Sequence, residues 1–224
     1  MLFGPPGAGK GTQAELLSDK TGYYHFESSK VIEACFNKEK PEKVFEIEGK
    51  SYKIKDEKKR WSTGELNSPP FVVYLMKERI KELAEEGKSI IFSGSPRTVY
   101  EAEKEIPLLK KLYGIKNIRF ILLEITAETT VFRNSHRRIC ELIRHSILFS
   151  PETEKLTKCP LDGSDLVRRK GLDDPESIKR RLEVFKEQTF PVIEIIQKYG
   201  LHLNKVNGER TVADIHKDVL NSIK

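Results

Sequence analysis

Residues 4–12 read Gly4-Pro5-Pro6-Gly7-Ala8-Gly9-Lys10-Gly11-Thr12, and they lie between a short apolar segment and a helical one, residues 13–20. Glycines let consecutive backbone N–H groups turn inward around a phosphate, and the helix start adds the positive end of its dipole. A lysine in this place reaches the terminal phosphates as a mobile cation. A glycine-rich turn with a solvated lysine is the alternative. Since strand, loop and helix patterns coincide, the stretch predicts a phosphate-binding loop.

Short apolar strands alternate with amphipathic helices along the rest of the chain. In the clearest helix, Val72, Leu75, Met76, Ile80 and Leu83 recur at helical spacing before Gly87. This alternation is typical of a parallel sheet covered by helices on both faces. We therefore predict an α/β fold with a parallel five-stranded sheet of the P-loop NTPase type, whose strands lie at 1–3, 23–26, 89–93, 118–125 and 201–206.

Two segments interrupt the alternation and are interpreted as insertions into this core. Residues 37–60 are rich in lysine and glutamate, but apolar and polar residues alternate on either side of Gly49, which predicts a small hairpin. Residues 139–169 hold two cysteines together with prolines and glycines.

Bulk composition indicates a globular protein that acts on small molecules. The chain has 224 residues, 38% of them hydrophobic, and a formal net charge of +6. Acidic residues are interspersed with the lysines, so we expect no nucleic-acid partner. No long apolar run or secretory pattern occurs, and the three cysteines are widely spaced. We therefore expect a cytoplasmic monomer without disulfides or a membrane partner.

Several further motifs follow the phosphate loop in a fixed order. A loop that ends in Gly9-Lys10-Gly11-Thr12-Gln13 resembles that of the adenylate kinase family. Four more stretches resemble motifs of the same family, namely Gly64-Glu65-Leu66, Gly94-Ser95-Pro96-Arg97-Thr98, Arg133 with Arg137-Arg138, and Asp173-Asp174 with Arg180-Arg181-Leu182. Together these motifs cover nearly the whole chain.

The resemblance implies three domains. The core would comprise residues 1–27, 88–137 and 173–224. A domain that binds the acceptor nucleoside monophosphate would span residues 28–87, with a charged insertion near 37–60, and a lid would span residues 138–172.

The resemblance also implies an activity, which is reversible phosphoryl transfer from MgATP to AMP giving two ADP, in nucleotide homeostasis. The partners would be ATP and AMP, and Mg²⁺ would accompany ATP. One alternative is a relative that prefers GMP, or UMP and CMP. Another is a nucleotide-gated binding protein with weak catalysis, which would bind a bisubstrate inhibitor without turnover.

By the resemblance, the site residues divide into three groups. Phosphoryl transfer needs cations around developing charge, and forked arginines supply them better than lysines. Surface ion pairs are the alternative role for each arginine. The catalytic residues would be Lys10, Arg97, Arg133, Arg137 and Arg181; ATP would be held by Gly7, Ala8, Gly9, Lys10, Gly11, Thr12, Arg133 and Arg137; the monophosphate would be held by Ser28, Gly94, Arg97, Glu101, Lys170 and Arg181, with Arg169 as an alternative to Lys170.

Three positions depart from the family pattern. Ser93 stands where relatives have an aspartate that holds Mg²⁺ through water, and Glu33 stands where they have a second arginine for the acceptor phosphate. Glu101 stands where adenylate enzymes have a glutamine that binds adenine. A carboxylate offers only acceptors, which suits guanine better than adenine. The alternative is that Glu101 faces solvent.

The lid segment carries part of a metal signature. By the resemblance, zinc-bearing relatives use two Cys-x-x-Cys pairs, or Cys-x-x-Asp as the second pair. Here the candidates for a structural Zn²⁺ are Cys140, His145, Cys159 and Asp162. The alternative is a lost site in which lid side chains such as Ile143, Leu148 and Leu156 pack together.

Overall fold

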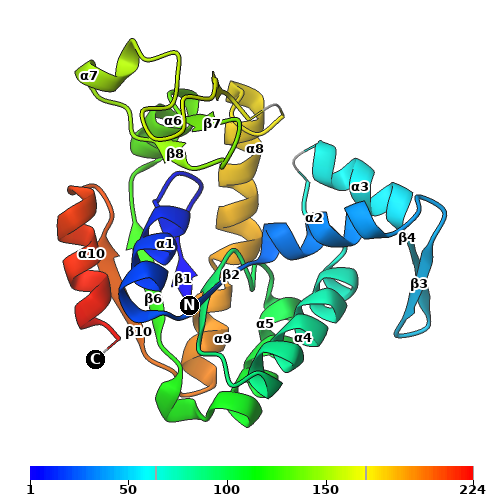
Figure 1. Cartoon of the computed structure of the whole chain (residues 1–224). Helices are drawn as coiled ribbons and strands as arrows, with labels where there is room; N and C mark the ends of the chain where they lie inside the picture. Colours follow the sequence, from blue (N-terminus) through cyan, green and yellow to red (C-terminus); the bar gives the residue numbers. More distant parts are fainter. Residues whose placement is uncertain (64, 170, 224) are drawn as a thin grey trace.

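The computed structural model describes residues 1–63, 65–169 and 171–223 and has a five-stranded parallel sheet at its centre. In space the strands follow the order β10-β6-β1-β5-β2 (Figure 1). Each overlaps a strand expected from the sequence: β1 Leu2–Phe3, β2 Tyr24–Glu27, β5 Ile90–Ser93, β6 Phe120–Glu124 and β10 Leu203–Asn207. The predicted fold class is therefore confirmed.

Side chains alternate between the two faces of this sheet, and helices cover both. Ile121 and Leu123 of β6 join a core cluster with α1 and α10, whereas Phe120 and Leu122 join a cluster with α5 and α9. A third cluster places α4 against Phe26 and the end of β5. Burial on both faces explains why the strands have near-continuous apolar sequences. These helices are α1 Lys10–Thr21, α4 Pro69–Glu85, α5 Val99–Tyr113, α9 Val192–Lys198 and α10 Val212–Asn221.

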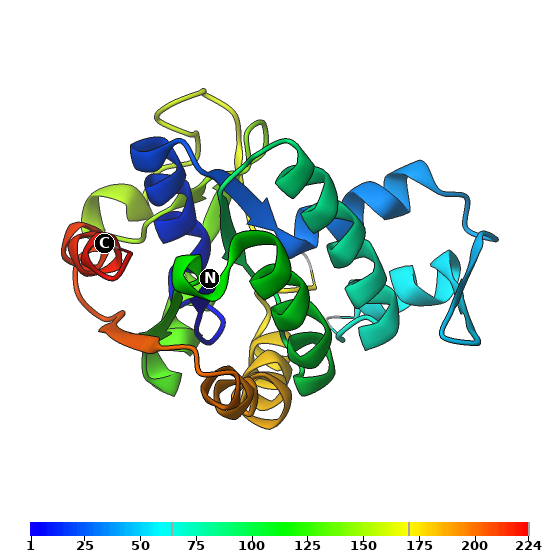
Figure 2. The ribbon, with the colours of Figure 1, turned by 90° about the horizontal axis from the view of Figure 1, so that it is seen from below.

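An arm of two helices and a hairpin projects to one side of the sheet (Figure 2). Its elements are α2 Ser28–Lys38, β3 Val44–Ile47, β4 Lys50–Lys53 and α3 Ile54–Ser62. The hairpin turns at Glu48 and Gly49, both with positive φ (51° and 75°), as a two-residue turn of type I′ requires. The hairpin expected around Gly49 is therefore confirmed.

A second small unit lies near α6 and α8 (Figure 1) and contains an antiparallel sheet of order β8-β7-β9. Its elements are β7 Arg138–Cys140, β8 Ser146–Ile147, α7 Pro151–Glu154 and β9 Leu166–Val167. It connects α6 Ala127–Ser135 to α8 Pro175–Val184, which continues through a π-helical turn, Phe185–Thr189. The short helical turn Ile115–Asn117 precedes β6.

Within the described residues, none of the helices has both the length and the apolar character that a membrane span requires.

The sheet topology directs the loops that follow β1 and β5 to the same edge. The phosphate loop follows β1, and Gly94 follows β5, which pairs with β1 in parallel. In open α/β sheets, ligands bind beyond the carboxyl ends of the strands. The loops after β1 and β5 therefore lie at the edge of the sheet where such folds bind ligands.

Candidate active site

The phosphate loop surrounds the amino group of Lys10. Lys10 Nζ donates hydrogen bonds to the carbonyl oxygens of Gly4 at 2.6 Å and Pro5 at 2.9 Å. Gly9 caps α1 with a φ of 88°, a conformation that L side chains rarely adopt. Gly11 and Thr12 lie in the first turn of α1, so their N–H groups belong to a helix start, which favours anions.

The opposite wall of the loop contacts α6. A Cβ added at Gly7, where φ is 82°, would lie 2.6 Å from Asn134 Nδ2, so this position requires glycine. Arg133 Nη1 donates to the Gly7 carbonyl at 3.4 Å. Burial lowers the pKa of Arg133, and the charge of Glu209 opposes that shift. Arg133 therefore lies against the phosphate loop.

Four arginines surround Lys10 with positive charge. Burial, followed by the charges of Arg181, Arg97, Arg137 and Arg169, lowers the pKa of Lys10 to about 7. Burial also lowers the pKa of Arg137 to about 10 and that of Arg181 to about 9, with Arg169 the next cause for both. Guanidinium groups stay charged at neutral pH. The cluster is therefore a half-buried concentration of cations that a polyanion would stabilise.

One carboxylate holds three of these arginines. Asp173, which is 4% exposed, accepts from Arg169 Nε at 3.1 Å and Arg169 Nη2 at 2.7 Å. Its Oδ1 also lies 3.7 Å from Arg137 Nη1 and 3.9 Å from Arg181 Nη1. Arg169 is thus fixed by a bidentate pair, whereas Arg137 and Arg181 lie at ion-pair distance without a hydrogen bond to Asp173.

The second group of predicted residues lines a narrow cleft beside β5. Arg97 Nε donates to the Gly94 carbonyl at 2.6 Å, and burial lowers the pKa of Arg97. Ser28 and Glu101 line the same cleft with Gly94 and Arg97, and apolar side chains such as Trp61 and Ile32 contribute to its walls. Ser28 Oγ is buried and makes no hydrogen bond to any described residue. It is therefore available to a ligand.

Glu101 does not face solvent, so that alternative is wrong. Its side chain is 2% exposed, and Glu101 Oε2 accepts from the Arg97 backbone N–H at 2.6 Å. Burial raises the pKa of Glu101, and hydrogen bonds and the charge from Arg97 oppose that shift. The residue therefore belongs to the cleft.

Ser93 and Glu33, the other two residues that depart from the family pattern, each contact a specific side chain. Ser93, at the carboxyl end of β5, has its Oγ 2.8 Å from His25 Nε2. Glu33 of α2 forms an ion pair with Arg144 of the small unit, with 3.3 Å between Nη1 and Oε1. Glu33 therefore contacts a cation from the opposite side of the site.

The four candidate metal ligands converge, with their ligand atoms within 4.8 Å of one another. Asp162 Oδ1 accepts from the Ser164 N–H at 2.9 Å and from Ser164 Oγ at 2.7 Å, whereas Asp162 Oδ2 is buried without a partner among the described residues. His145 lies between the thiols, with Nδ1 3.0 Å from Cys140 Sγ and Nε2 3.4 Å from Cys159 Sγ. An orphaned buried oxygen beside two buried thiols and an imidazole is a donor set that fits zinc.

The packing alternative for this segment is wrong for two of its three side chains, because Ile143 is 60% exposed and Leu148 is 58% exposed.

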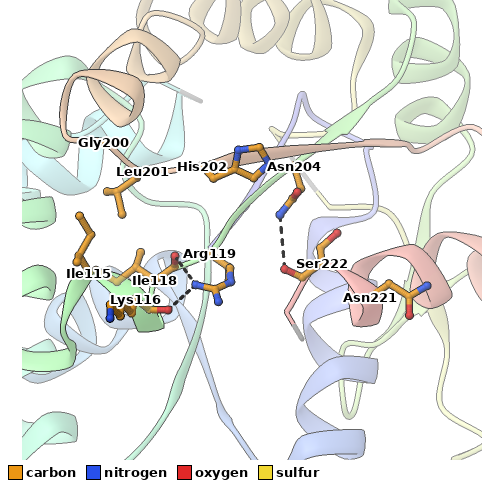
Figure 3. Close-up of a pocket in the computed structure, with 10 residues that line it drawn as sticks. All are labelled: Ile115, Lys116, Ile118, Arg119, Gly200, Leu201, His202, Asn204, Asn221 and Ser222. Carbon is orange, nitrogen blue, oxygen red and sulfur yellow. Dashed lines mark hydrogen bonds between the residues drawn. The ribbon is translucent and has the colours of Figure 1, made fainter.

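Two predicted residues, Gly64 and Lys170, lie outside the described residues. The anchoring role of Asp173 was not expected from the sequence, because Arg169 and Asp173 lie between β9 and α8, outside any helix whose spacing would pair them. A larger hollow of about 500 Å³ lies at the amino ends of β6 and β10 (Figure 3). Its lining residues, such as Arg119 and His202, include none from the phosphate loop or the arginine cluster.

Comparisons with known proteins agree with this geometry. A family model described as adenylate kinase matches residues 2–201. A curated adenylate kinase from Bacillus velezensis is 33% identical over 224 residues, which cover 98% of this chain and 94% of the relative. Adenylate kinases from Clostridium botulinum (31% identical, 99% and 96% covered) and Methanocella arvoryzae (32% identical, 100% and 97% covered) are similar over the same extent. The chain therefore belongs to the adenylate kinase family and is a nucleoside monophosphate kinase.

Proposed function

We propose that this chain transfers a phosphoryl group from MgATP to AMP, giving two ADP, in nucleotide homeostasis. The observation that carries the proposal is the half-buried cation cluster, in which Arg97, Arg137, Arg169 and Arg181 all depress the pKa of Lys10. Such crowding is unfavourable in the free protein and becomes favourable when phosphates enter. The adenylate kinases to which the chain is similar support AMP as the acceptor.

In this proposal the role of each cation follows from its position in the site. The N–H groups of the phosphate loop and Lys10 hold the terminal phosphates of ATP, and Arg133 lies along the donor. Arg97 binds the acceptor phosphate from the end of β5. Arg137 and Arg181 stabilise the negative charge on the transferred phosphoryl group, because neither guanidinium donates a hydrogen bond to Asp173. A loose transition state needs mainly such positioning and charge stabilisation.

Mg²⁺ enters as part of the MgATP substrate, as is usual in this family. Bound with ATP, it would neutralise part of the phosphate charge. Thr12 in the first turn of α1 and Ser93 at the end of β5 would offer hydroxyl groups to its water ligands. Hydroxyls hydrogen-bond to water on the ion more weakly than a carboxylate does, so the affinity for Mg²⁺ rests more on the nucleotide.

In this proposal the arm that contains α2 and α3 and the small unit that contains β7, β8 and β9 close over the site. Residues 28–87 form the acceptor-binding domain, residues 138–172 form the lid, and the remaining segments form the core. Arg144 and Glu33 lie on opposite walls, 3.3 Å apart. From the core, Arg180 Nη1 donates to the Thr63 carbonyl of the acceptor-binding domain at 3.3 Å. Closure of such walls excludes water, which would otherwise accept the phosphoryl group.

We also propose a structural Zn²⁺ held by Cys140 Sγ, Cys159 Sγ, one nitrogen of His145 and Asp162 Oδ2. The unpartnered Asp162 Oδ2 supports this donor set. Ser164 orients the carboxylate through its other oxygen, as residues next to metal ligands often do. Four protein ligands complete a tetrahedral site and leave no open position for substrate, so the ion would be structural and would stabilise the lid.

The test is steady-state phosphoryl transfer from MgATP to AMP, GMP, CMP and UMP. We expect AMP to be the best acceptor. Lys10→Ala and Arg97→Ala should each reduce kcat/KM by about 100-fold or more, whereas Arg210→Ala, which removes an exposed arginine of the β10–α10 loop, should leave it unchanged. Transfer to no acceptor, together with tight binding of ATP, would contradict the proposal and favour a nucleotide-gated binding protein.

A further inference from the structure

One buried carboxylate near the cleft beside β5 has no part in the proposed chemistry. Glu57 of α3 is 3% exposed, whereas the other charged side chains of α3 face solvent. Its Oε2 accepts from Asn67 Nδ2 at 2.9 Å and from the Ser68 backbone N–H at 2.9 Å. Asn67 Nδ2 also donates to the Glu57 carbonyl at 2.7 Å. Since burial of a carboxylate is costly unless it is hydrogen-bonded, these contacts hold α3 to residues 67 and 68.

The same carboxylate completes the start of α4. Ser68 is the N-cap of α4, but its side chain makes no capping hydrogen bond, and the two prolines that follow, Pro69 and Pro70, have no N–H. In a capping box, a glutamate at the third helical position accepts from the N–H of the N-cap residue. Glu57 does the same from another helix, at a place where the α4 dipole favours an anion. The bond therefore fixes where α4 begins relative to α3.

The segments that Glu57 joins form part of the wall of the cleft. Trp61 follows Glu57 by one helical turn, on the same face of α3, and its ring centroid lies 6.1 Å from that of Phe36. The residues of this region that line the cleft are Trp61, Glu65, Leu66, Asn67 and Val72. They come from the end of α3, the connection to α4 and the start of α4. Glu57 therefore ties together the three pieces of one wall.

We propose that Glu57 is a positioning residue for the acceptor, which holds this wall in its binding geometry through Asn67 and Ser68. The inference rests on the proposed function, because it assumes that the cleft holds the monophosphate. Glu57 is not among the described residues that line the cleft, so it acts without touching the substrate. A wall that is ordered in advance removes the entropic cost of ordering it when the acceptor binds. Loss of the contact should weaken acceptor binding, whereas the transfer step, which depends on Lys10 and the arginines, should be unchanged.

The test replaces Glu57 by two side chains of similar size. Glu57→Met fills the space without an oxygen, whereas Glu57→Gln keeps one oxygen that can accept from both Asn67 Nδ2 and the Ser68 N–H. Glu57→Met should raise KM for AMP by about tenfold, with kcat and KM for ATP unchanged. Glu57→Gln should restore KM for AMP to within about threefold of the unaltered protein. Asp56→Met, at an exposed neighbour on α3, is the matched control and should leave KM for AMP unchanged.

Two further measurements do not require turnover. Calorimetric titration with AMP alone should show a loss of affinity in Glu57→Met that matches the rise in KM. Hydrogen exchange at the Ser68 amide, followed by NMR, should be faster in Glu57→Met and unchanged in Glu57→Gln, because only the latter keeps an acceptor for that N–H. If Glu57→Met does not fold, Glu57→Asp serves in the same comparison, since its carboxylate is one methylene too short to accept both bonds.

Each outcome decides between distinct conclusions. An unchanged KM for AMP in Glu57→Met would overturn this inference alone, because the unaltered protein would still transfer a phosphoryl group to AMP. A fall in kcat with a rise in both KM values would mean a general structural role and would overturn it too. An equal rise in KM for AMP in Glu57→Gln would show that the two hydrogen bonds are not the cause. Absence of transfer to AMP in the unaltered protein would overturn the proposed function instead.

Discussion

Arg169 donates two hydrogen bonds to Asp173, from Nε to Oδ2 at 3.1 Å and from Nη2 to Oδ1 at 2.7 Å. The same carboxylate lies within ion-pair distance of Arg137 and Arg181. One buried anion therefore holds three cations near the phosphate loop before any nucleotide binds. The cluster would otherwise be driven apart by its own charge.

Asp173→Asn should destabilise the free protein and impair catalysis. The amide keeps the shape but removes the buried charge, so the free energy of unfolding should fall by about 2–3 kcal/mol. Loss of positioning should reduce kcat by about tenfold or more. Urea denaturation and steady-state kinetics measure the two effects.

The neighbouring aspartate provides the control for that variant. Asp174 caps α8, and its side chain accepts from the Ser177 N–H at 3.0 Å. Asparagine caps helices as well as aspartate does, so Asp174→Asn should change the free energy of unfolding by less than about 0.5 kcal/mol. Equal losses in both variants would contradict a special role for Asp173.

ATP binding should be accompanied by proton uptake near neutral pH. The pKa of Lys10 is about 7 in the free protein, because burial and the arginines disfavour its charged form. The phosphates of ATP should raise that pKa, so Lys10 takes up a proton and the affinity for ATP falls as pH rises above about 7. Calorimetry in buffers of different ionisation enthalpy measures the uptake, which should disappear in Lys10→Met. If Lys10→Met bound as many protons with ATP as the unaltered protein does, a group other than Lys10 would be the proton acceptor.

Gly94→Ala should weaken acceptor binding without affecting ATP. A Cβ at Gly94 would lie 2.6 Å from Ser28 Oγ and 3.2 Å from Arg97 Nη2, so it would displace two acceptor contacts. We expect KM for AMP to rise by about tenfold or more while KM for ATP is unchanged. Gly22→Ala is the matched control, because Gly22 also has positive φ but a Cβ there meets no described atom within 4 Å. A rise in both KM values would indicate a general distortion.

The small unit that contains β7, β8 and β9 should hold about one zinc ion per chain. Cys140→Ser and Cys159→Ser should lose the metal and lower Tm, whereas Cys35→Ser, which alters the cysteine of α2, should retain it. Metal analysis and thermal unfolding with and without a chelator measure both effects. Protein that holds no zinc after purification in zinc-containing buffer, and whose Tm does not respond to the chelator, would contradict the site.

The sequence predicted the sheet and the phosphate loop because local patterns specify them. Apolar runs specify strands such as Phe120–Glu124, and glycine spacing specifies the loop around Lys10. The hairpin was predictable for the same reason, since Gly49 stands between two alternating segments.

Long-range electrostatics and burial were not predictable in this way. Asp173 was expected only as part of a motif, because its contacts with Arg137 and Arg181 depend on how α6 and α8 pack. The surroundings of Glu101 depend on Glu105, one helical turn away, and on Ser95 from the preceding loop. Periodicity places residues on a face, but it does not show which face of α5 meets the cleft.

Incubation of the purified protein with ADP and Mg²⁺ alone isolates phosphoryl transfer between two nucleotides, because no other phosphoryl donor or acceptor is present. We expect ATP and AMP to appear in equal amounts and Lys10→Ala to abolish both. Release of inorganic phosphate without ATP, or no change in ADP, would contradict the assignment of phosphoryl transfer between two nucleotides.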